Sequence, residues 1–122
     1  AFLGPESQRS AEAARCAGEQ NNFWEYHDYL FTHQKGENEG YFGDENLKLF
    51  AKELGLDSSL FDECLDSNKY TEMIIASKET GSKAGVSGTP KGFIIKDGKI
   101  VGMIDGAESY KTVKEKIDNA LK

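Results

Sequence analysis

Two cysteines, Cys16 and Cys64, are the residues of this sequence with the chemistry for thiol redox reactions or for a metal site. They lie too far apart to form a Cys-x-x-Cys redox dithiol, and no third or fourth ligand completes a zinc set with them. The sequence therefore supplies no Cys-x-x-Cys motif. An even number of cysteines permits one disulfide bond, and the spacing alone does not decide whether it forms.

The two histidines, His27 and His33, are six residues apart, which places them on different faces of a helix. No ligand cluster surrounds them, so we predict no metal site, and His27 is expected to pack in the core. The acidic segment 37–39 lacks the alternating oxygen ligands of a calcium loop and is predicted to be a solvated linker. No Ser-His-Asp arrangement and no glycine-rich phosphate loop is recognisable.

Gly88, Thr89 and Pro90 directly precede a strand-like run and form the third candidate for function. The ordinary interpretation is a trans proline that opens a strand. Base rates favour it, because only about 5–6% of X–Pro bonds in folded proteins are cis.

Five helices are predicted to position these residues, from apolar spacing of three to four and from Pro, Asp or Gly at the helix ends. The aromatic run Phe23–Phe31 is expected to be the main core helix, with Phe23, His27 and Leu30 on one side and Trp24 in the core. The helices are expected near residues 5–19, 23–31, 44–54, 57–65 and 69–84.

Aspartates and glycines set the predicted ends of the later helices. Asp44 is expected to cap one helix that Gly55 ends, and Asp57 to cap the next. Four residues are predicted on the inner face of the helix after Asp57: Leu60, Phe61, Cys64 and Leu65.

The pattern then changes to two β-branched runs, Phe93–Ile95 and Ile100–Ile104, around Asp97-Gly98. An Asp-Gly pair in this setting predicts a two-residue hairpin, because both turn residues need positive φ. A closing helix follows, with Tyr110, Val113, Ile117 and Leu121 on one stripe. The fold class is therefore α/β and mostly helical.

Length and charge exclude several function classes. The 122 residues suffice for one modest core, 38% are hydrophobic and 30% are charged. The formal net charge of -6 argues against binding to nucleic acid or to anionic membrane surfaces. No apolar run approaches the roughly 20 residues of a membrane span, and no secretory signal opens the chain.

Three stretches carry distinctive motifs: residues 11–28, residues 54–67, and the segment from Gly85 through Pro90 to the closing helix. The characteristic residues are Ala-Glu-Ala-Ala-Arg-Cys-Ala at 11–17, Phe-Trp-Glu-Tyr-His-Asp at 23–28, Leu-Gly-Leu-Asp at 54–57 and Gly-Val-Ser-Gly-Thr-Pro at 85–90. Together, in this order and across nearly the whole chain, they resemble the DsbA-like branch of the thioredoxin superfamily.

The resemblance implies a thioredoxin-like DsbA fold, with residues 1–85 as the helical insertion domain and 86–122 as the C-terminal part of the thioredoxin-like domain. In the family the Cys-x-x-Cys precedes the inserted helices, and this sequence begins after that point. Ala1-Phe2-Leu3 is expected to be the tail of the strand that leads into the insertion. Because the first residue is not Met, we expect a portion of a longer product that is inactive alone, with no catalytic residue and no cofactor.

The resemblance also assigns roles to residues. Gly88, Thr89 and Pro90 would form the substrate-binding loop, with the Thr89–Pro90 bond cis and the Thr89 backbone open to an extended substrate. A disulfide between Cys16 and Cys64 is favoured, with two buried thiols or a redox-active pair as alternatives. The Lys-Gly pair after Pro90 departs from the family, in which small or aromatic residues are more frequent.

The implied function is protein disulfide oxidation or isomerisation on unfolded proteins, outside the cytoplasm in the periplasm, in the cell envelope or after secretion. Expected partners are unfolded protein or peptide substrates and a redox partner protein. A second copy, or the segment Ala1–Leu3, is expected to pair with the open hairpin edge. The competing hypothesis is a non-catalytic thioredoxin-like peptide-binding module that kept the groove and lost the thiols.

Overall fold

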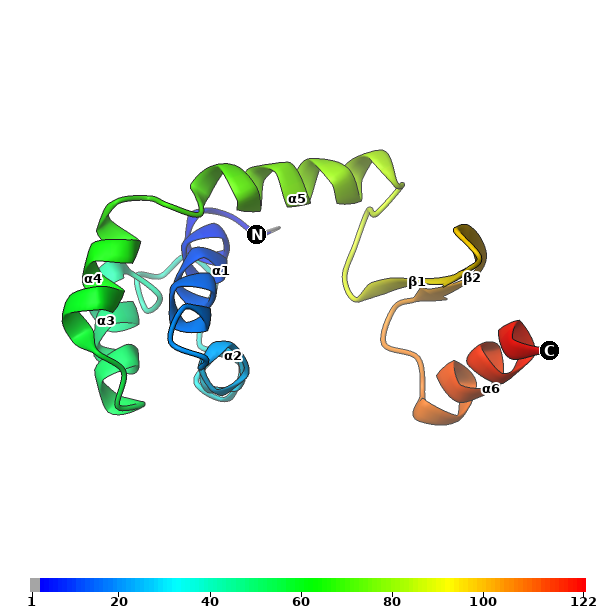
Figure 1. Cartoon of the computed structure of the whole chain (residues 1–122), viewed down its shortest axis with the longest axis horizontal. Helices are drawn as coiled ribbons and strands as arrows, with labels where there is room; N and C mark the ends of the chain where they lie inside the picture. Colours follow the sequence, from blue (N-terminus) through cyan, green and yellow to red (C-terminus); the bar gives the residue numbers. More distant parts are fainter. Residues whose placement is uncertain (1–2) are drawn as a thin grey trace. The chain divides into compact units, whose positions relative to one another are not determined.

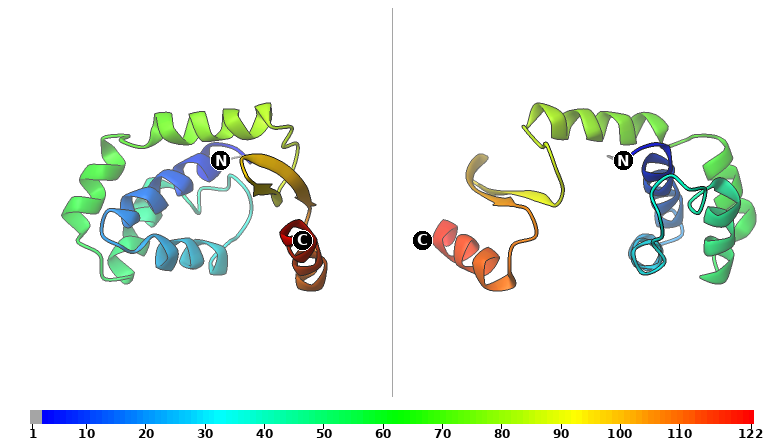
Figure 2. Two further views of the ribbon diagram at one scale, coloured as in Figure 1. Left: turned by 45° about the vertical axis from the view of Figure 1, so that its right-hand side comes forward. Right: turned by 180° about the vertical axis from the view of Figure 1, so that it is seen from behind.

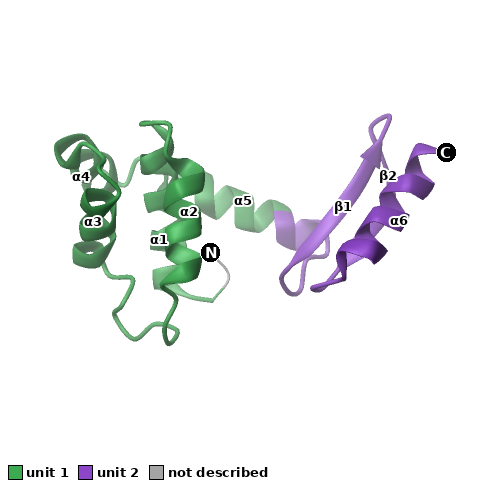
Figure 3. Ribbon diagram, turned by 90° about the horizontal axis from the view of Figure 1, so that it is seen from below, with its two compact units in different colours: residues 1–80 green, residues 81–122 purple. Residues whose placement is uncertain are grey.

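The computed structural model describes residues 3–122, which form two compact units. We call residues 3–80 the helical unit and residues 81–122 the hairpin unit (Figure 3). The predicted order of five helices, a hairpin and a closing helix is confirmed, and so is the mostly helical α/β class. The elements are α1 (Pro5–Gly18), α2 (Phe23–Thr32), α3 (Asp44–Glu53), α4 (Ser58–Asp66), α5 (Thr71–Lys83), β1 (Lys91–Lys96), β2 (Lys99–Asp105) and α6 (Tyr110–Leu121).

The helical unit is built around α1, which contacts α2, α3 and α4 (Figures 1 and 2). Its alanines bring the α1 backbone close to its neighbours, because a methyl group occupies little space between helices. Pro5 lies in the first turn of α1, as predicted. The expected strand tail begins with Ala1 and Phe2, which lie outside the described residues. The core consists of Ala13, Ala14, Cys16, Ala17, Tyr26, Leu30, Leu47, Phe50, Ala51, Leu56, Phe61, Cys64 and Leu65.

A disulfide bond joins Cys16 of α1 to Cys64 of α4, with the two Cα atoms 5.8 Å apart. The pairing that the family resemblance favoured is confirmed. Both cysteines are buried in the core of the helical unit. The bond therefore ties the first helix of this unit covalently to the fourth.

The structure corrects the predicted orientation of α2. Tyr26 and Leu30 face the core, and the buried Tyr26 hydroxyl donates a hydrogen bond to the Leu47 carbonyl oxygen at 2.8 Å. Trp24 is 68% exposed and the His27 side chain is 37% exposed, so the prediction that they pack in the core is wrong. Because nearly every turn of α2 carries aromatic residues on several faces, the periodicity alone does not identify the inner face.

One helix cap and one inner-face assignment also differ from expectation. Asp44 lies in the first turn of α3 and makes no capping bond, because its carboxylate accepts hydrogen bonds from the Arg9 guanidinium. Asp57 does cap α4, accepting from the Leu60 N–H at 3.0 Å. Leu60 itself is 58% exposed, so its assignment to the inner face is wrong; Phe61 is one of the residues that are buried there.

The hairpin unit contains the antiparallel pair β1–β2 with α6 packed against both strands (Figure 3). Asp97 and Gly98 form the predicted turn with φ of 50° and 73°. A register irregularity lies between Ile94 and Ile95. Ser109 caps α6 by accepting from the Thr112 N–H.

Candidate functional site

The loop 86–90 joins α5 to β1 in the hairpin unit, and Gly88, Thr89 and Pro90 are all exposed there. The Thr89–Pro90 peptide bond is cis, the geometry that the resemblance implies. The Pro90 carbonyl oxygen accepts a hydrogen bond from the Gly106 N–H at 2.9 Å. One end of the loop is thus fixed to the segment that follows β2.

The backbone of Thr89 has no hydrogen-bond partner within residues 3–122. Its N–H donor and C=O acceptor are therefore free on an exposed segment directly before a strand. Free backbone groups in such a position can pair with the backbone of an extended polypeptide, as in the addition of a strand to a sheet. Such pairing is largely independent of the substrate's side chains.

Charged groups support the segment beside this loop. The Lys91 ammonium lies 3.4 Å from the Asp105 carboxylate across the β1–β2 pair. The Glu108 carboxylate accepts from the Asp105 N–H at 2.8 Å and from the Lys116 ammonium at 2.6 Å. The Lys116 ammonium, followed by the Asp105 N–H, lowers the pKa of Glu108 below its ordinary value. These contacts anchor the end of β2 to α6 and so support the Pro90 anchor.

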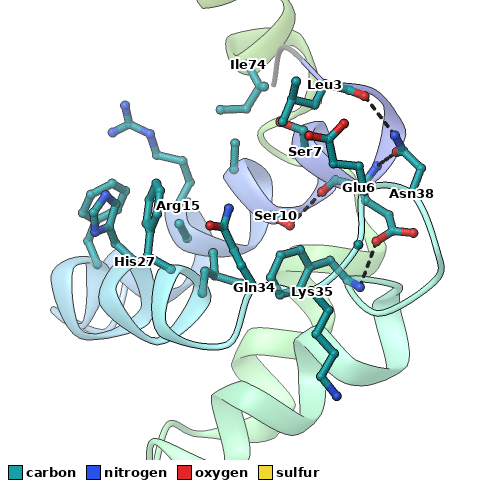
Figure 4. A pocket seen from close by; sticks show the side chains of 18 residues that line it. Leu3, Glu6, Ser7, Ser10, Arg15, His27, Gln34, Lys35, Asn38 and Ile74 are labelled. Atoms are coloured by element: carbon teal, nitrogen blue, oxygen red, sulfur yellow. Dashed lines mark hydrogen bonds between the residues drawn. The ribbon is translucent and has the colours of Figure 1, made fainter. Parts of the chain in front are cut away.

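A cavity of about 350 Å³ lies in the helical unit between α1, α2 and the loop that follows α2. Figure 4 shows Arg15 and His27 on one side of it and Asn38 on the other. Its apolar lining comprises Leu3, Ala11, Ala14, Phe23, Leu30, Phe31, Phe42 and Ile74. This cavity could not be predicted from the sequence pattern, although the aromatic density of α2 was a signal for it.

Four rings of α2 contact one another; three of them, Phe23, His27 and Phe31, line this cavity, and Trp24 adjoins His27. The centroid of the His27 ring lies 4.7 Å from that of Phe31 and 5.2 Å from that of Trp24. Trp24 in turn lies 5.1 Å from Phe23 in an edge-to-face arrangement. Aromatic groups in contact, rather than isolated rings, therefore form this surface.

The predicted site residues fall into two separate sets. Gly88, Thr89 and Pro90 belong to the hairpin unit, whereas Cys16 and Cys64 belong to the helical core. Because both cysteines are buried and bonded to each other, neither is a free thiol.

In residues 3–122 no group of three or more His, Cys, Asp or Glu side chains is placed to hold a metal ion. None of the described helices combines the length and apolar character that crossing a membrane requires.

The chain belongs to the family described as "DSBA-like thioredoxin domain", whose pattern matches residues 1–118. The fold and class that the sequence resemblance implied are therefore confirmed. No solved structure matches the chain.

Three curated relatives match 90 residues, or 74% of this chain. The "Na(+)/H(+) antiporter NhaA 1" of Salinispora arenicola is 37% identical, and "NhaA 3" of Salinispora tropica is 36% identical. The "Na(+)/H(+) antiporter NhaA" of Herminiimonas arsenicoxydans is 32% identical. The matched part covers only 13% of the length of each Salinispora protein and 14% of the third.

Proposed function

We propose that this chain is the substrate-holding portion of a DsbA-like protein disulfide oxidoreductase or isomerase that acts on thiols of unfolded proteins. The observation that carries the proposal is the exposed Thr89 backbone, which has no partner within residues 3–122. Membership of the DSBA-like family supports it, because the matched residues 1–118 include this loop. Gly88, Thr89 and Pro90 would hold an extended segment of the substrate.

The chain's own contribution is binding and orientation. An extended substrate would pair its backbone with the Thr89 N–H and C=O, which fixes the position of a substrate sulfur. The Gly106–Pro90 hydrogen bond would keep the loop in place during binding. The thiolate that exchanges with that sulfur would belong to a Cys-x-x-Cys, which these 122 residues do not contain.

We do not propose sodium–proton exchange for this chain. The antiporter names describe proteins of which the match covers 13–14%, so the names refer to whole proteins that consist mostly of other sequence. What the similarity supports is that a DsbA-like segment of this kind also occurs within larger proteins. A location outside the cytoplasm is proposed because the chain holds a buried disulfide, a bond that forms and persists in oxidising compartments.

The competing proposal is a peptide-binding module without redox chemistry, in which binding at the exposed Thr89 backbone is the whole function. Both proposals require the loop to bind polypeptide. They differ in whether a reactive dithiol acts on the bound chain. The coding sequence around this segment separates them, because an upstream Cys-x-x-Cys supports the oxidoreductase and its absence supports the module.

The binding step is tested by titrating the isotope-labelled chain with a reduced and alkylated unfolded protein and following amide NMR signals. We expect the largest shifts at Gly88, Thr89 and Lys91. The variant Thr89→Pro removes the N–H donor and should abolish these shifts. The matched variant Thr89→Ala changes only the side chain and should retain them. Equal binding by both variants would contradict the proposal.

Turnover is tested separately. The chain alone should show no oxidase or isomerase activity towards a reduced or scrambled model protein, because its two cysteines are buried and bonded to each other. A Cys16→Ala variant serves as the control for contaminating enzymes. Activity in the wild-type chain that this variant loses would overturn the assignment of both cysteines to structure.

A further inference from the structure

The aromatic surface of α2 remains open although the helical unit has a well-packed core. Trp24 is 68% and Phe31 62% exposed, and both contact the His27 ring beside the cavity. Clustered apolar surface of this kind marks an interaction site more often than scattered exposed residues do. The cavity volume is about 350 Å³, near the lower end of the roughly 300–1,000 Å³ that ligand sites span. A cavity of this volume holds one large side chain rather than the surface of a folded protein.

The charges around the cavity determine which ligand fits. The Arg15 guanidinium lies 5.5 Å from the Phe23 ring centroid, and within residues 3–122 no ion pair joins it to a carboxylate. The Lys35 ammonium instead lies over the Tyr41 ring, 4.1 Å from its centroid. A positive charge that is free to bind an anion therefore adjoins the aromatic surface at Arg15.

The acidic groups of the cavity lie elsewhere. The Glu6 carboxylate accepts hydrogen bonds from the Gly40 and Phe42 N–H groups, so it is already engaged. Glu37 belongs to the loop after α2, directly before Asn38 in the sequence, and no ion pair joins it to Arg15 within residues 3–122. A ligand would therefore place a carboxylate towards Arg15 and its apolar group among the rings.

We propose that this cavity is a second polypeptide site, which binds an aromatic or large aliphatic side chain of an extended segment that has an acidic neighbour. The site is distinct from the loop at Thr89 because it lies wholly in the helical unit. The proposal rests on the proposed function for the choice of an unfolded polypeptide as ligand. It deepens that function by adding a preference for apolar residues next to Asp or Glu.

Trp24 is the single tryptophan of the chain and lies beside the cavity, so its fluorescence reports on binding. The probe is a short disordered Gly/Ser peptide that carries one Phe followed by one Glu and no Trp or Tyr. We expect a saturable change in Trp24 emission. Replacing the peptide's Phe by Ser should remove the change, and replacing its Glu by Lys should weaken binding roughly tenfold.

Protein variants test the two halves of the site. Phe31→Ala should weaken binding about tenfold or more, whereas Leu60→Ala, an equally exposed apolar residue of α4, should have no effect. Arg15→Glu should reverse the preference between the Glu and Lys peptides. Lys52→Glu, an exposed charge reversal on α3, is the matched control. Far-UV circular dichroism verifies that each variant folds.

The outcomes separate this proposal from the one on the Thr89 loop. A Trp24 response that persists in Thr89→Pro supports the cavity even if the loop fails to bind. Loop shifts without any Trp24 response overturn the cavity and leave the loop proposal intact. Equal responses to the Phe and Ser peptides, or an Arg15→Glu variant with unchanged preference, would also overturn it.

Discussion

All the fully buried apolar side chains within residues 3–122 belong to the helical unit, whereas residues 81–122 contain none. The helical unit combines a packed core with a disulfide across its helices. The hairpin unit instead depends on turn geometry, a capped helix and ion pairs near the surface. The candidate loop thus lies in the unit with the weaker core, which fits the general rule that binding segments occur where local stability is low.

The charge distribution follows the same division. Most of the chain's 21 acidic residues lie within residues 1–80, whereas more than half of its 15 basic residues lie within 81–122. The two units therefore present surfaces of opposite average charge. The net charge of -6 conceals this difference.

The largest expected difference between the units comes from the disulfide. Replacing Cys16 and Cys64 by Ala should lower the free energy of unfolding of the helical unit by roughly 4 kcal/mol, because the bond closes a long loop in the unfolded chain. Amide exchange in β1 and β2 should not change. Denaturant unfolding and hydrogen exchange by NMR would measure both, and a loss shared equally by the two units would contradict the comparison.

The hairpin turn should be the sensitive point of the other unit. Gly98 has φ of 73°, so Gly98→Ala should cost about 1–2 kcal/mol in the hairpin, and the helical unit should not respond. Gly88→Ala is the control, because Gly88 lacks a positive φ and has no neighbouring atoms where a Cβ would stand. Exchange rates of β1 and β2 amides would show the effect. An equal effect of both substitutions would exclude the turn as its cause.

A single buried hydrogen bond should matter in the helical unit. Tyr26→Phe removes the donor to the Leu47 carbonyl and should destabilise this unit by about 1 kcal/mol. Tyr110→Phe, on an exposed residue of α6, should have almost no effect. Thermal unfolding would compare the stability of the two variants directly. A similar loss of stability in both would mean that burial of the hydroxyl does not determine the size of the effect.

Low pH should lower the stability of the helical unit, because it protonates Asp44. The Arg9 guanidinium lowers the pKa of Asp44 below its ordinary value of 3.8. The stabilisation is present above this value and disappears as the pH falls through the lower pKa of the folded state. Because the Asp44 side chain is 45% exposed, the effect should be modest. Asp44→Asn should flatten this part of the stability curve, as followed by unfolding at a series of pH values.

The weakest expected effect is association through the open edge of the hairpin. Ile95, Ile100 and Met103 are exposed on a sheet that has two strands within residues 3–122, and free strand edges pair with other chains. We expect light scattering to show a dimer at high protein concentration. Lys substitutions at Ile95 should prevent it, whereas a monomer at all concentrations would contradict the expectation.

The sequence predicted the elements better than it predicted their orientation. Asp97-Gly98, Gly55 and Asp57 act locally, so their effects on turns and helix ends could be inferred without tertiary information. The inner face of α2 could not, because its aromatic residues cover several faces and only packing against Leu47 shows that Tyr26 points inward. Arg9 likewise engages Asp44 from a distant helix, which no local rule for helix caps contains.

Of the two candidate sites, the sequence predicted the loop but not the cavity. The loop at Gly88, Thr89 and Pro90 came from a family motif that is contiguous in sequence. The cavity joins Leu3, α1, α2, the loop after α2 and Ile74. These side chains come from several parts of the chain, and no single stretch of the sequence contains them all.

The disulfide also changes what a protease can do to the helical unit. The loop between α2 and α3 is exposed from His33 to Gly40 and carries Lys35, a trypsin site. Because Cys16 precedes this loop and Cys64 follows it, a cut after Lys35 leaves two fragments that are still covalently joined. Such a nicked unit would keep its core and run as one molecule until a reductant separates the fragments.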